Sequence, residues 1–346
     1  MLFSKTTVAA AVATAVSTTA AFADPIHVKG SSTVFPFAMM SADTFTENHA
    51  GFDYPNVESG GSSAGLKAFC QGVGADSVDI ATASRKIKAK EIKACADSGV
   101  TDIIEVVIGF DGLVFAGDKK GPDYSFTPAD WYAALGARVL VDGALVENTA
   151  MQWDEINANL PANAIRTFIP AAKHGTREVF DQKMLVKGCK ATGAYDAFLA
   201  ENGGDAKAAS KSCMVIRSDK AVTELEVFGS ETVDMIRGTK GSIGLLGLAF
   251  YEANASDLKA ATINDVYPSA DSIATGEYPV SRPLFMYIKK ANIGVTPGIK
   301  EYVQTILSDE MTGPGGFLTL FGLVSNPDVD AVRATVSNEV TMSASS

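Results

Sequence analysis

Short apolar segments along the chain alternate between two spacings. Runs of β-branched and aromatic residues, typical of strands, end in small polar residues and are followed by stretches with apolar residues at helical spacing. The clearest strand and helix pairs are 26–29 with 37–47, 52–57 with 64–71, and 78–82 with 89–97. Because strands alternate with helices, the pattern predicts an α/β fold with a parallel sheet.

The same order recurs further along the chain. Residues 165–169 alternate as a strand does, and 179–186 carry apolar residues at helical spacing. Between them lies the polar turn His174–Arg177. The first N–H groups of a helix have no partner inside the helix, so such a turn is suited to binding an oxyanion.

Other stretches suggest how the chain is organised. Residues 103–116 and 278–288 are long β-rich runs that we expect to cross between domains. The pattern predicts a helix over 223–237 and a strand over 242–251. Residues 187–211 are rich in Gly, Ala and Lys, which indicates a surface excursion.

Composition indicates an exported globular protein. The 346 residues are 47% hydrophobic and 20% charged, enough for a core in each of two domains. Lys5, an apolar run and Ala21-Phe22-Ala23 have the form of a signal peptide, so we exclude 1–23 from the fold and expect a periplasmic location. No later apolar run reaches the roughly 18 residues that a membrane span needs. The net charge of -11 argues against nucleic acid or an anionic membrane as partner.

The four cysteines favour disulfides, because exported proteins meet an oxidising environment. Three connectivities are possible. We expect Cys70–Cys95 and Cys189–Cys213, since these close two loops of similar size. A metal site is the alternative, but the sequence has no C-x-x-C or H-x-x-x-H spacing, so we expect neither metal nor cofactor.

Hydroxyl groups gather in the four predicted loops, and none of these short clusters contains an acid. A dehydrated tetrahedral oxyanion needs many directed donors, which hydroxyls and backbone N–H groups supply. An arginine adds charge-assisted bonds. The clusters are Ser31-Ser32-Thr33, Ser62-Ser63, Ser84-Arg85 and His174-Gly175-Thr176-Arg177.

An ordered set of motifs resembles the phosphate-binding periplasmic proteins that feed phosphate ABC transporters, the PstS-like family. The motifs are Gly30-Ser31-Ser32-Thr33-Val34-Phe35-Pro36, Gly61-Ser62-Ser63-Ala64-Gly65, Asp79-Ile80-Ala81-Thr82-Ala83-Ser84-Arg85, His174-Gly175-Thr176-Arg177, Gly241-Ser242-Ile243-Gly244 and Tyr278-Pro279-Val280-Ser281-Arg282-Pro283-Leu284. The resemblance implies a type II periplasmic-binding-protein fold, in which two α/β lobes joined by two crossing strands hold phosphate in the cleft between them. We expect lobe I over 24–111 and 282–346, and lobe II over 112–281. Hinges are expected near 110–112 and 280–282.

The resemblance also implies a ligand set and partners. Contacts to phosphate are expected from Ser32, Thr33, Val34, Ser62, Ser84, His174, Gly175, Thr176 and Arg177, with Ser31, Ser63 and Arg85 as further candidates. Arg177 is expected to be the main cation. The implied partners are phosphate and the permease subunits of an ABC transporter, and the implied protein is a monomer that makes and breaks no bond.

Two departures from the family pattern bear on selectivity. Many relatives have an aspartate at the position of Ser84, where the carboxylate accepts a proton from phosphate and so rejects sulfate. His174 stands where Ser is common, and its imidazole can donate a hydrogen bond or add charge when protonated. The choice between phosphate and another oxyanion, such as sulfate or molybdate, therefore stays open.

Two further alternatives remain. Gly61-Ser62-Ser63-Ala64-Gly65 matches the G-x-S-x-G pattern of a nucleophile elbow, and a serine hydrolase using Ser63 would need His174 as its base. His174 lies at a helix start and not on a loop after an acidic partner, which argues against this. An extracellular protein that uses the fold without binding an anion is the other alternative.

Overall fold

The computed structural model describes residues 24–172, 174–227 and 229–343. The predicted signal segment, 1–23, lies outside the described residues. A mixed sheet with the strand order β2-β1-β3-β13-β4-β10-β8-β9 runs through the molecule, and β11 pairs with β4 at its side. Its strands are β1 (His27–Gly30), β2 (Asn56–Ser59), β3 (Ile80–Ala83), β4 (Ile103–Asp118), β8 (Thr167–Pro170), β9 (Val222–Leu225), β10 (Ile243–Gly247), β11 (Leu258–Ala260) and β13 (Ser281–Lys289).

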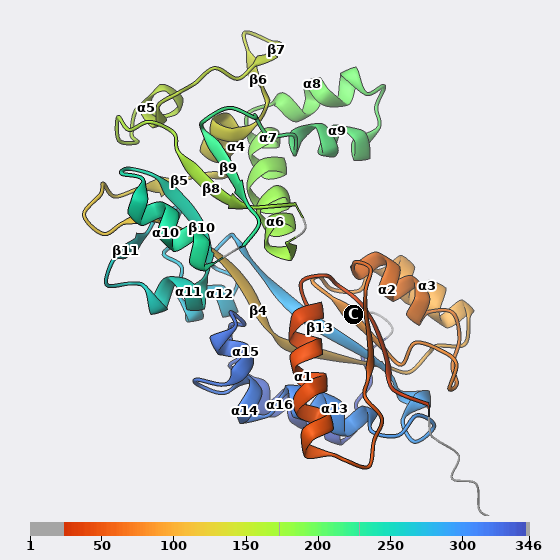
Figure 1. The fold of residues 1–346 in the computed structure, drawn as a ribbon. Coiled ribbons are helices and arrows are strands. Elements are labelled where there is room, and N and C mark those ends of the chain that lie inside the picture. The colour runs from red at the N-terminus through yellow and green to blue at the C-terminus, as the bar shows by residue number, and fades with distance from the viewer. Residues whose placement is uncertain (1–23, 173, 228, 344–346) are drawn as a thin grey trace, which may run out of the picture.

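Strand β4 joins the two halves of this sheet. Its first part, up to Gly112, pairs antiparallel with β13, and the part from Leu113 to Gly117 pairs antiparallel with β10. On either side the strands pair in parallel, β1 with β2 and β3, and β8 with β9 and β10. Figure 1 shows β4 and β13 passing between a lower and an upper body. The two crossing strands are therefore confirmed.

The lower body has the N- and C-terminal parts of the chain. Its core joins α1 to α13, where the Phe45 and Tyr302 rings meet edge to face at 5.7 Å between centroids. A smaller core under α2 and α3 contains the buried Tyr287. The helices of this body are α1 (Phe35–Asn48), α2 (Ser62–Phe69), α3 (Ala89–Asp97), α13 (Ile299–Ile306), α14 (Asp309–Thr312), α15 (Phe317–Leu320) and α16 (Val329–Ser337), with a 3-10 turn at Lys290–Asn292.

The upper body is built around an aromatic core. Trp131 and Trp153 are fully buried with ring centroids 5.5 Å apart, and Phe115, Phe126 and Phe180 pack around Trp131. Its helices are α4 (Pro128–Leu135), α5 (Trp153–Ile156), α6 (Gly175–Phe180), a π-helix (Asp181–Val186), α7 (Lys187–Ala191), α8 (Ala194–Glu201), α9 (Ala206–Cys213), α10 (Ser230–Gly238), α11 (Leu248–Ala253) and α12 (Ala270–Ala274). Two small sheets, β5 (Ser125–Phe126) with β12 (Thr262–Ile263) and β6 (Arg138–Val141) with β7 (Ala144–Glu147), lie outside the main one.

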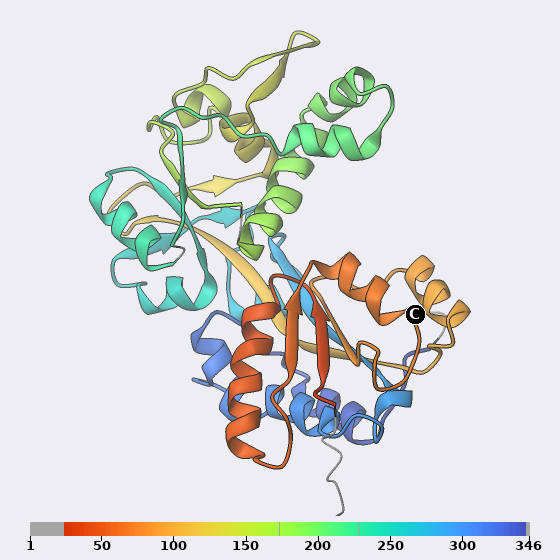
Figure 2. The same ribbon diagram turned by 45° about the vertical axis from the view of Figure 1, so that its right-hand side comes forward.

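The apolar clusters of the two bodies separate near the expected lobe limits. The large upper cluster draws on residues 113–280 with the single addition of Val324, whereas the clusters of the lower body use residues on either side of that range. The lobe limits at 111/112 and 281/282 stay a prediction that this separation supports. Figure 2, turned by 45°, shows the same two bodies with the crossing strands between them.

Two predicted elements are wrong in part. The helix expected over 223–237 begins only at Ser230, because Val222–Leu225 forms β9 and pairs in parallel with β8. The strand expected over 242–251 ends at Gly247, where its pairing with β4 ends, and the chain continues as helix α11. In both places a distant strand decides the local conformation. β9 forms because it pairs with β8, and β10 ends where its pairing with β4 ends.

Both expected disulfides are present. Cys70–Cys95 joins the end of α2 to α3, and Cys189–Cys213 joins α7 to α9. The region 187–211, expected as a surface excursion, is the helical arm α7, α8 and most of α9 that projects from the upper body in Figure 1. Each link closes a loop whose restriction in the unfolded chain stabilises the fold by about 3 kcal/mol.

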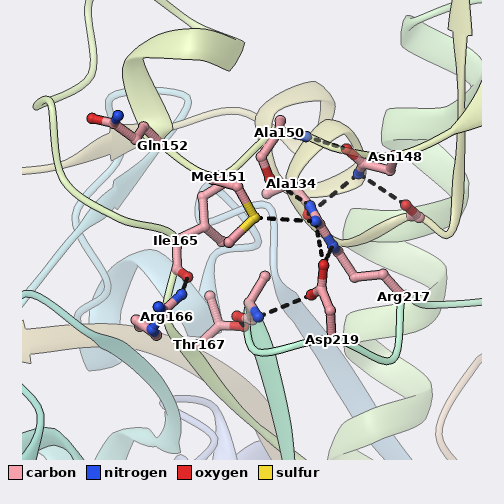
Figure 3. A network of polar contacts seen from close by, with 12 residues as sticks. Ala134, Asn148, Ala150, Met151, Gln152, Ile165, Arg166, Thr167, Arg217 and Asp219 are labelled. Atoms are coloured by element: carbon pink, nitrogen blue, oxygen red, sulfur yellow. Dashed lines mark hydrogen bonds and ion pairs between the residues drawn. The ribbon is translucent and has the colours of Figure 1, made fainter.

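A polar network around the buried Arg217 ties strand β8 to neighbouring segments (Figure 3). Arg217 donates from Nη1 to the carbonyl of Ala150 at 2.6 Å and from Nε to Asp219 at 3.0 Å. The Asp219 carboxylate accepts from the N–H of Ala221, whose carbonyl accepts from Thr167 in β8. These bonds tie together segments far apart in the sequence, and so fix the strand that leads into the loop at His174.

Candidate functional site

One arginine lies where the loops of both bodies meet. Arg282, near the start of β13, donates from Nη2 to the Thr33 hydroxyl at 2.6 Å and to the Gly175 carbonyl at 2.9 Å. Its Nη1 donates to the Ser84 hydroxyl at 3.1 Å. The Arg282 side chain is only 11% exposed. A single guanidinium therefore connects the loop after β1, the loop after β3 and the start of α6.

The loop after β1 is folded around its own hydroxyl group. The buried Ser31 Oγ accepts from the backbone N–H of Thr33 at 3.2 Å and lies 3.4 Å from that of Val34. Ser31 therefore occupies N–H groups expected to face a ligand and acts as a support for the loop. Thr33 is buried and points to Arg282, while Ser32 is exposed.

The loops that start α2 and follow β3 meet through two serines. Ser62 Oγ accepts from the Ser84 backbone N–H at 3.1 Å and lies 3.3 Å from Ser84 Oγ. Gly65 allows α2 to lie close against β1, since a Cβ there would lie 2.5 Å from the Lys29 carbonyl oxygen. The hydroxyls of Thr33, Ser84 and Ser62 thus belong to one network with Arg282.

Arg85, the residue after Ser84, is held away from this network. Its guanidinium forms a two-bond pair with Glu91 at 2.8 and 2.9 Å and donates to Ser63 at 3.0 Å. The hydrogen bonds that Arg85 donates to Glu91 raise the pKa of Arg85 above its ordinary value. This pair neutralises the Arg85 charge close to the cleft and leaves less of it for a ligand.

The start of α6 contacts the other body directly. A Cβ on Gly175 would meet the Thr33 hydroxyl and lie 2.8 Å from Thr33 Cα, so only a glycine permits this approach. His174 precedes the helix, and its Nε2 lies 3.0 Å from the Glu226 carbonyl oxygen. Thr176 is half-buried in the first turn of α6. Gly175 and Thr176 are therefore beside the Arg282 network, whereas the His174 ring reaches the loop after β9.

Arg177 is placed differently from the expectation. Its side chain is 7% exposed, and its Nε donates to Asp181 at 2.7 Å while its Nη1 donates to Glu224 at 2.6 Å and to the Pro170 carbonyl at 3.2 Å. Burial opposes the effect, but these two carboxylates raise the pKa of Arg177. Arg177 is thus already neutralised within its own body.

Two acids lie near Arg282, but farther from it than Asp181 and Glu224 lie from Arg177. Asp111 Oδ2 is 3.3 Å from its Nε, and Glu178 Oε2 is 3.5 Å from its Nη1. Burial raises the pKa of Asp111, although Arg282 opposes this shift. The Glu178 side chain is 57% exposed, so solvent screens its pairing with the arginine. Arg282 therefore keeps more of its charge for a ligand than Arg177 does.

A cavity of about 690 Å³ opens beside this network. Both bodies line it: Ser62, Ser84 and Arg282 reach it from one side, and Glu178 and Lys183 from α6 and the π-helix. The lining contains four cations, Arg85, Lys86, Lys183 and Arg282, and the acid Glu178. Because Glu91 neutralises Arg85, three cations are left against that acid. In a chain of net charge -11, this local excess of positive charge favours an anionic ligand.

The arrangement does not favour the hydrolase alternative. Ser63 accepts a hydrogen bond from Arg85, and His174 is engaged with the Glu226 carbonyl, so the two residues do not form the pair that a nucleophile and its base require. No group of three or more potential metal ligands occurs among the described residues. Within the described parts of the chain, no helix is long and apolar enough to cross a membrane.

Arg282 is the residue of this network that the predicted ligand set lacks. It stands in the Ser281-Arg282-Pro283 segment and was expected only to serve as part of a hinge. Its position on a crossing strand was itself a signal, because such a strand passes between the two bodies and can reach loops of both. Its pairing with Asp111 on the neighbouring β4 then directs the guanidinium into the cleft.

The chain belongs to the PBP superfamily, since a family model described as a PBP superfamily domain matches residues 8–310. Protein SphX of Synechococcus elongatus is 29% identical over 279 residues, which cover 78% of this chain and 70% of SphX. Phosphate-binding protein PstS of Staphylococcus haemolyticus is 26% identical over 291 residues, covering 82% of this chain and 76% of that protein. The predicted family resemblance is confirmed.

Solved structures show the same fold. A possible phosphate binding protein from Planctomyces limnophilus superposes with a TM-score of 0.68 at 24% identity and covers 93% of this chain and 100% of its own. PstS from Borrelia burgdorferi gives a TM-score of 0.56 at 18% identity, over 82% of this chain and 93% of that one. The predicted fold, two α/β lobes joined by crossing strands, is confirmed.

Proposed function

We propose that this protein captures inorganic phosphate in the cleft between its lobes and releases it to a transport partner. The observation that carries the proposal is the Arg282 network, which joins hydroxyls of one lobe to the start of α6 in the other. The relatives named as phosphate-binding proteins support the same ligand.

The chemistry of the network suits a tetrahedral oxyanion. Because Thr33 accepts a hydrogen bond from Arg282, its hydroxyl keeps its own hydrogen to donate to a ligand. The contact between the Ser62 and Ser84 hydroxyls uses one of their two hydrogens and leaves the other for the ligand. The guanidinium adds charge-assisted bonds to the same anion. A site of neutral donors with one strong cation can hold a small anion without burying a further charge.

The ligand set that we propose keeps most of the predicted residues. Arg282 takes the part of main cation that was expected of Arg177, because Arg177 is neutralised by Asp181 and Glu224. We assign Ser31 to loop support and place Arg85, Ser63 and His174 at the margin of the site. The Val34 N–H, which was expected to face the ligand, is already directed to Ser31 Oγ. The proposed contacts are therefore Ser32, Thr33, Ser62, Ser84, Gly175, Thr176 and Arg282.

We further propose that binding is the whole task and that no bond is made or broken. Lobe movement at the expected hinges, 110–112 and 280–282, would open and close the cleft, and Arg282 lies within the second hinge. Closure expels water, which strengthens the hydrogen bonds to the anion. The proposed setting is the periplasm, where the signal segment directs a monomer that meets the permease subunits of an ABC transporter.

Calorimetry tests the proposal. Protein stripped of bound anion is titrated with phosphate and then, in separate runs, with sulfate and molybdate. We expect phosphate to bind and to compete with either other anion. The control for the charge of Arg282 is Arg85→Met. It removes an arginine that lines the same cavity but is already paired with Glu91.

The outcomes separate the alternatives. Binding of sulfate or molybdate with no binding of phosphate would replace the ligand while keeping the site. Absence of binding to any of these anions would favour a protein that uses the fold for another purpose. Steady turnover of p-nitrophenyl esters that Ser63→Ala abolishes would instead indicate the hydrolase.

A further inference from the structure

Lys183 is a cation in the cleft that the Arg282 network does not use. It is half-buried in the π-helix Asp181–Val186, and it lines the cavity of about 690 Å³ together with Arg282. Single π-helical turns within α-helices are often found at functional sites. In this chain the turn follows α6 directly, and so continues the segment that brings Gly175 to Thr33.

The surroundings of Lys183 disfavour its charge. Among the described residues, its ammonium has no ion pair and no hydrogen bond, although Glu178 lines the same cavity. Burial, and then the charges of Lys187 and Arg282, lower the pKa of Lys183. Two cations facing one partly dehydrated cavity repel each other unless an anion lies between them. The arrangement is therefore incomplete without a negatively charged ligand.

We propose that Lys183 is a second cationic contact for the bound anion, contributed by lobe II across the cavity from Ser62 and Ser84. The proposal rests on the proposed function, because it assumes an anion held by Arg282. It adds a second cation to that site. Arg282 lies at the expected hinge and Lys183 on the moving lobe, so the two can hold the anion as a clamp. Such a clamp favours doubly charged anions over singly charged ones, since each charge of the anion gains a partner.

A matched pair of lysine variants isolates this contact. Lys187 is one helical turn further along and lines a neighbouring cavity, but it is not among the residues that line the cavity shared with Arg282. Lys183→Met and Lys187→Met therefore remove the same charge from nearly the same part of the chain. Any effect of net charge on the acidic protein is common to both variants.

Calorimetry and stopped-flow measurements with phosphate give the test. Lys183→Met is expected to weaken phosphate binding about tenfold, mainly through faster dissociation, because it removes a contact of the bound state. Lys187→Met is expected to change the affinity by less than about twofold, as is usual for an exposed charge. Lys183→Arg, which keeps the charge, is expected to stay within about threefold of the parent.

Several results would overturn the proposal. Equal affinities of the two methionine variants would show that Lys183 makes no contact with the anion. A loss confined to the association rate and removed by salt would show remote steering instead of a contact. Failure of the parent itself to bind phosphate would overturn the proposed function, whereas phosphate binding by the parent with an unaffected Lys183→Met variant would overturn this inference alone.

Discussion

Two arginines near the cleft illustrate how surroundings decide the use of a charge. Arg177 and Arg282 are both largely buried, with side chains 7% and 11% exposed. Arg177 holds two carboxylates at 2.6–2.7 Å, whereas Arg282 holds two hydroxyls and a carbonyl, with its acids at 3.3 and 3.5 Å. Close carboxylates cancel a charge, while neutral acceptors leave its field available to a ligand.

The comparison predicts that the two arginines serve different purposes. Arg177 connects α6 to the π-helix and to β9, so it holds the shape of lobe II. Arg282 connects lobe I to the start of α6, so it lies where a ligand would bind. Replacing each with methionine, which keeps an unbranched apolar stem but carries no charge, tests this division.

The largest expected effect is the loss of phosphate binding in Arg282→Met. Removing the cation of a largely dehydrated anion site costs about 3 kcal/mol or more, which is a loss of affinity of at least about 100-fold. Calorimetry on the stripped protein measures it, with Arg85→Met as the control. If the variant binds phosphate as tightly as the parent, Asp111 and Glu178 already neutralise Arg282 and the arginine does not bind the anion.

Arg177→Met is expected to reduce stability and leave phosphate affinity within about threefold of the parent. The variant leaves Asp181 without its partner in a part-buried position, and about 2 kcal/mol is expected after allowing for the exposure of Glu224. Urea unfolding measures the free energy of unfolding, and calorimetry the affinity. A loss of binding larger than that of Arg282→Met, with unchanged stability, would restore Arg177 as the main cation.

Gly175→Ala tests whether Arg282 needs the close contact between the lobes. The added Cβ would lie 2.8 Å from Thr33 Cα, so the lobes must separate slightly and the bond from Arg282 to the Gly175 carbonyl must lengthen. We expect phosphate affinity to fall about tenfold, with the stability of each lobe little changed. Gly60→Ala, where an added Cβ has its nearest neighbour at 3.8 Å, is the matched control. Equal affinities of the two variants would contradict the prediction.

The smallest expected effect is that of Ser84→Ala. The variant removes one hydroxyl that accepts from Arg282 and is shared with Ser62, for a loss of about 1 kcal/mol or roughly fivefold in affinity. The same loss for phosphate and sulfate is expected, because a hydroxyl group does not distinguish their charge. If Ser84→Ala abolishes phosphate binding while Arg282→Met does not, the hydroxyls and not the guanidinium provide most of the binding free energy.

Much of this protein could be predicted because the signals are local. Strands with alternating apolar residues, the hydroxyl-rich turns after them and the helices that follow depend on neighbours in sequence. The turns after β1, β3 and β8 and the start of α2 were therefore placed within a few residues. The two cysteine pairs were also identified correctly, since each closes a short loop.

The tertiary structure alone decided which arginine faces the cleft. Arg177 lies in a turn with local signs of an anion site, yet Asp181, four residues on, and Glu224, 47 residues away, draw its guanidinium aside. Arg282 has no such sign, but the pairing of β13 with β4 carries it between the lobes to Thr33, which is 249 residues distant in sequence. The electrostatic environment of a side chain depends on charges brought together by folding, and a local pattern records only near neighbours such as Asp181.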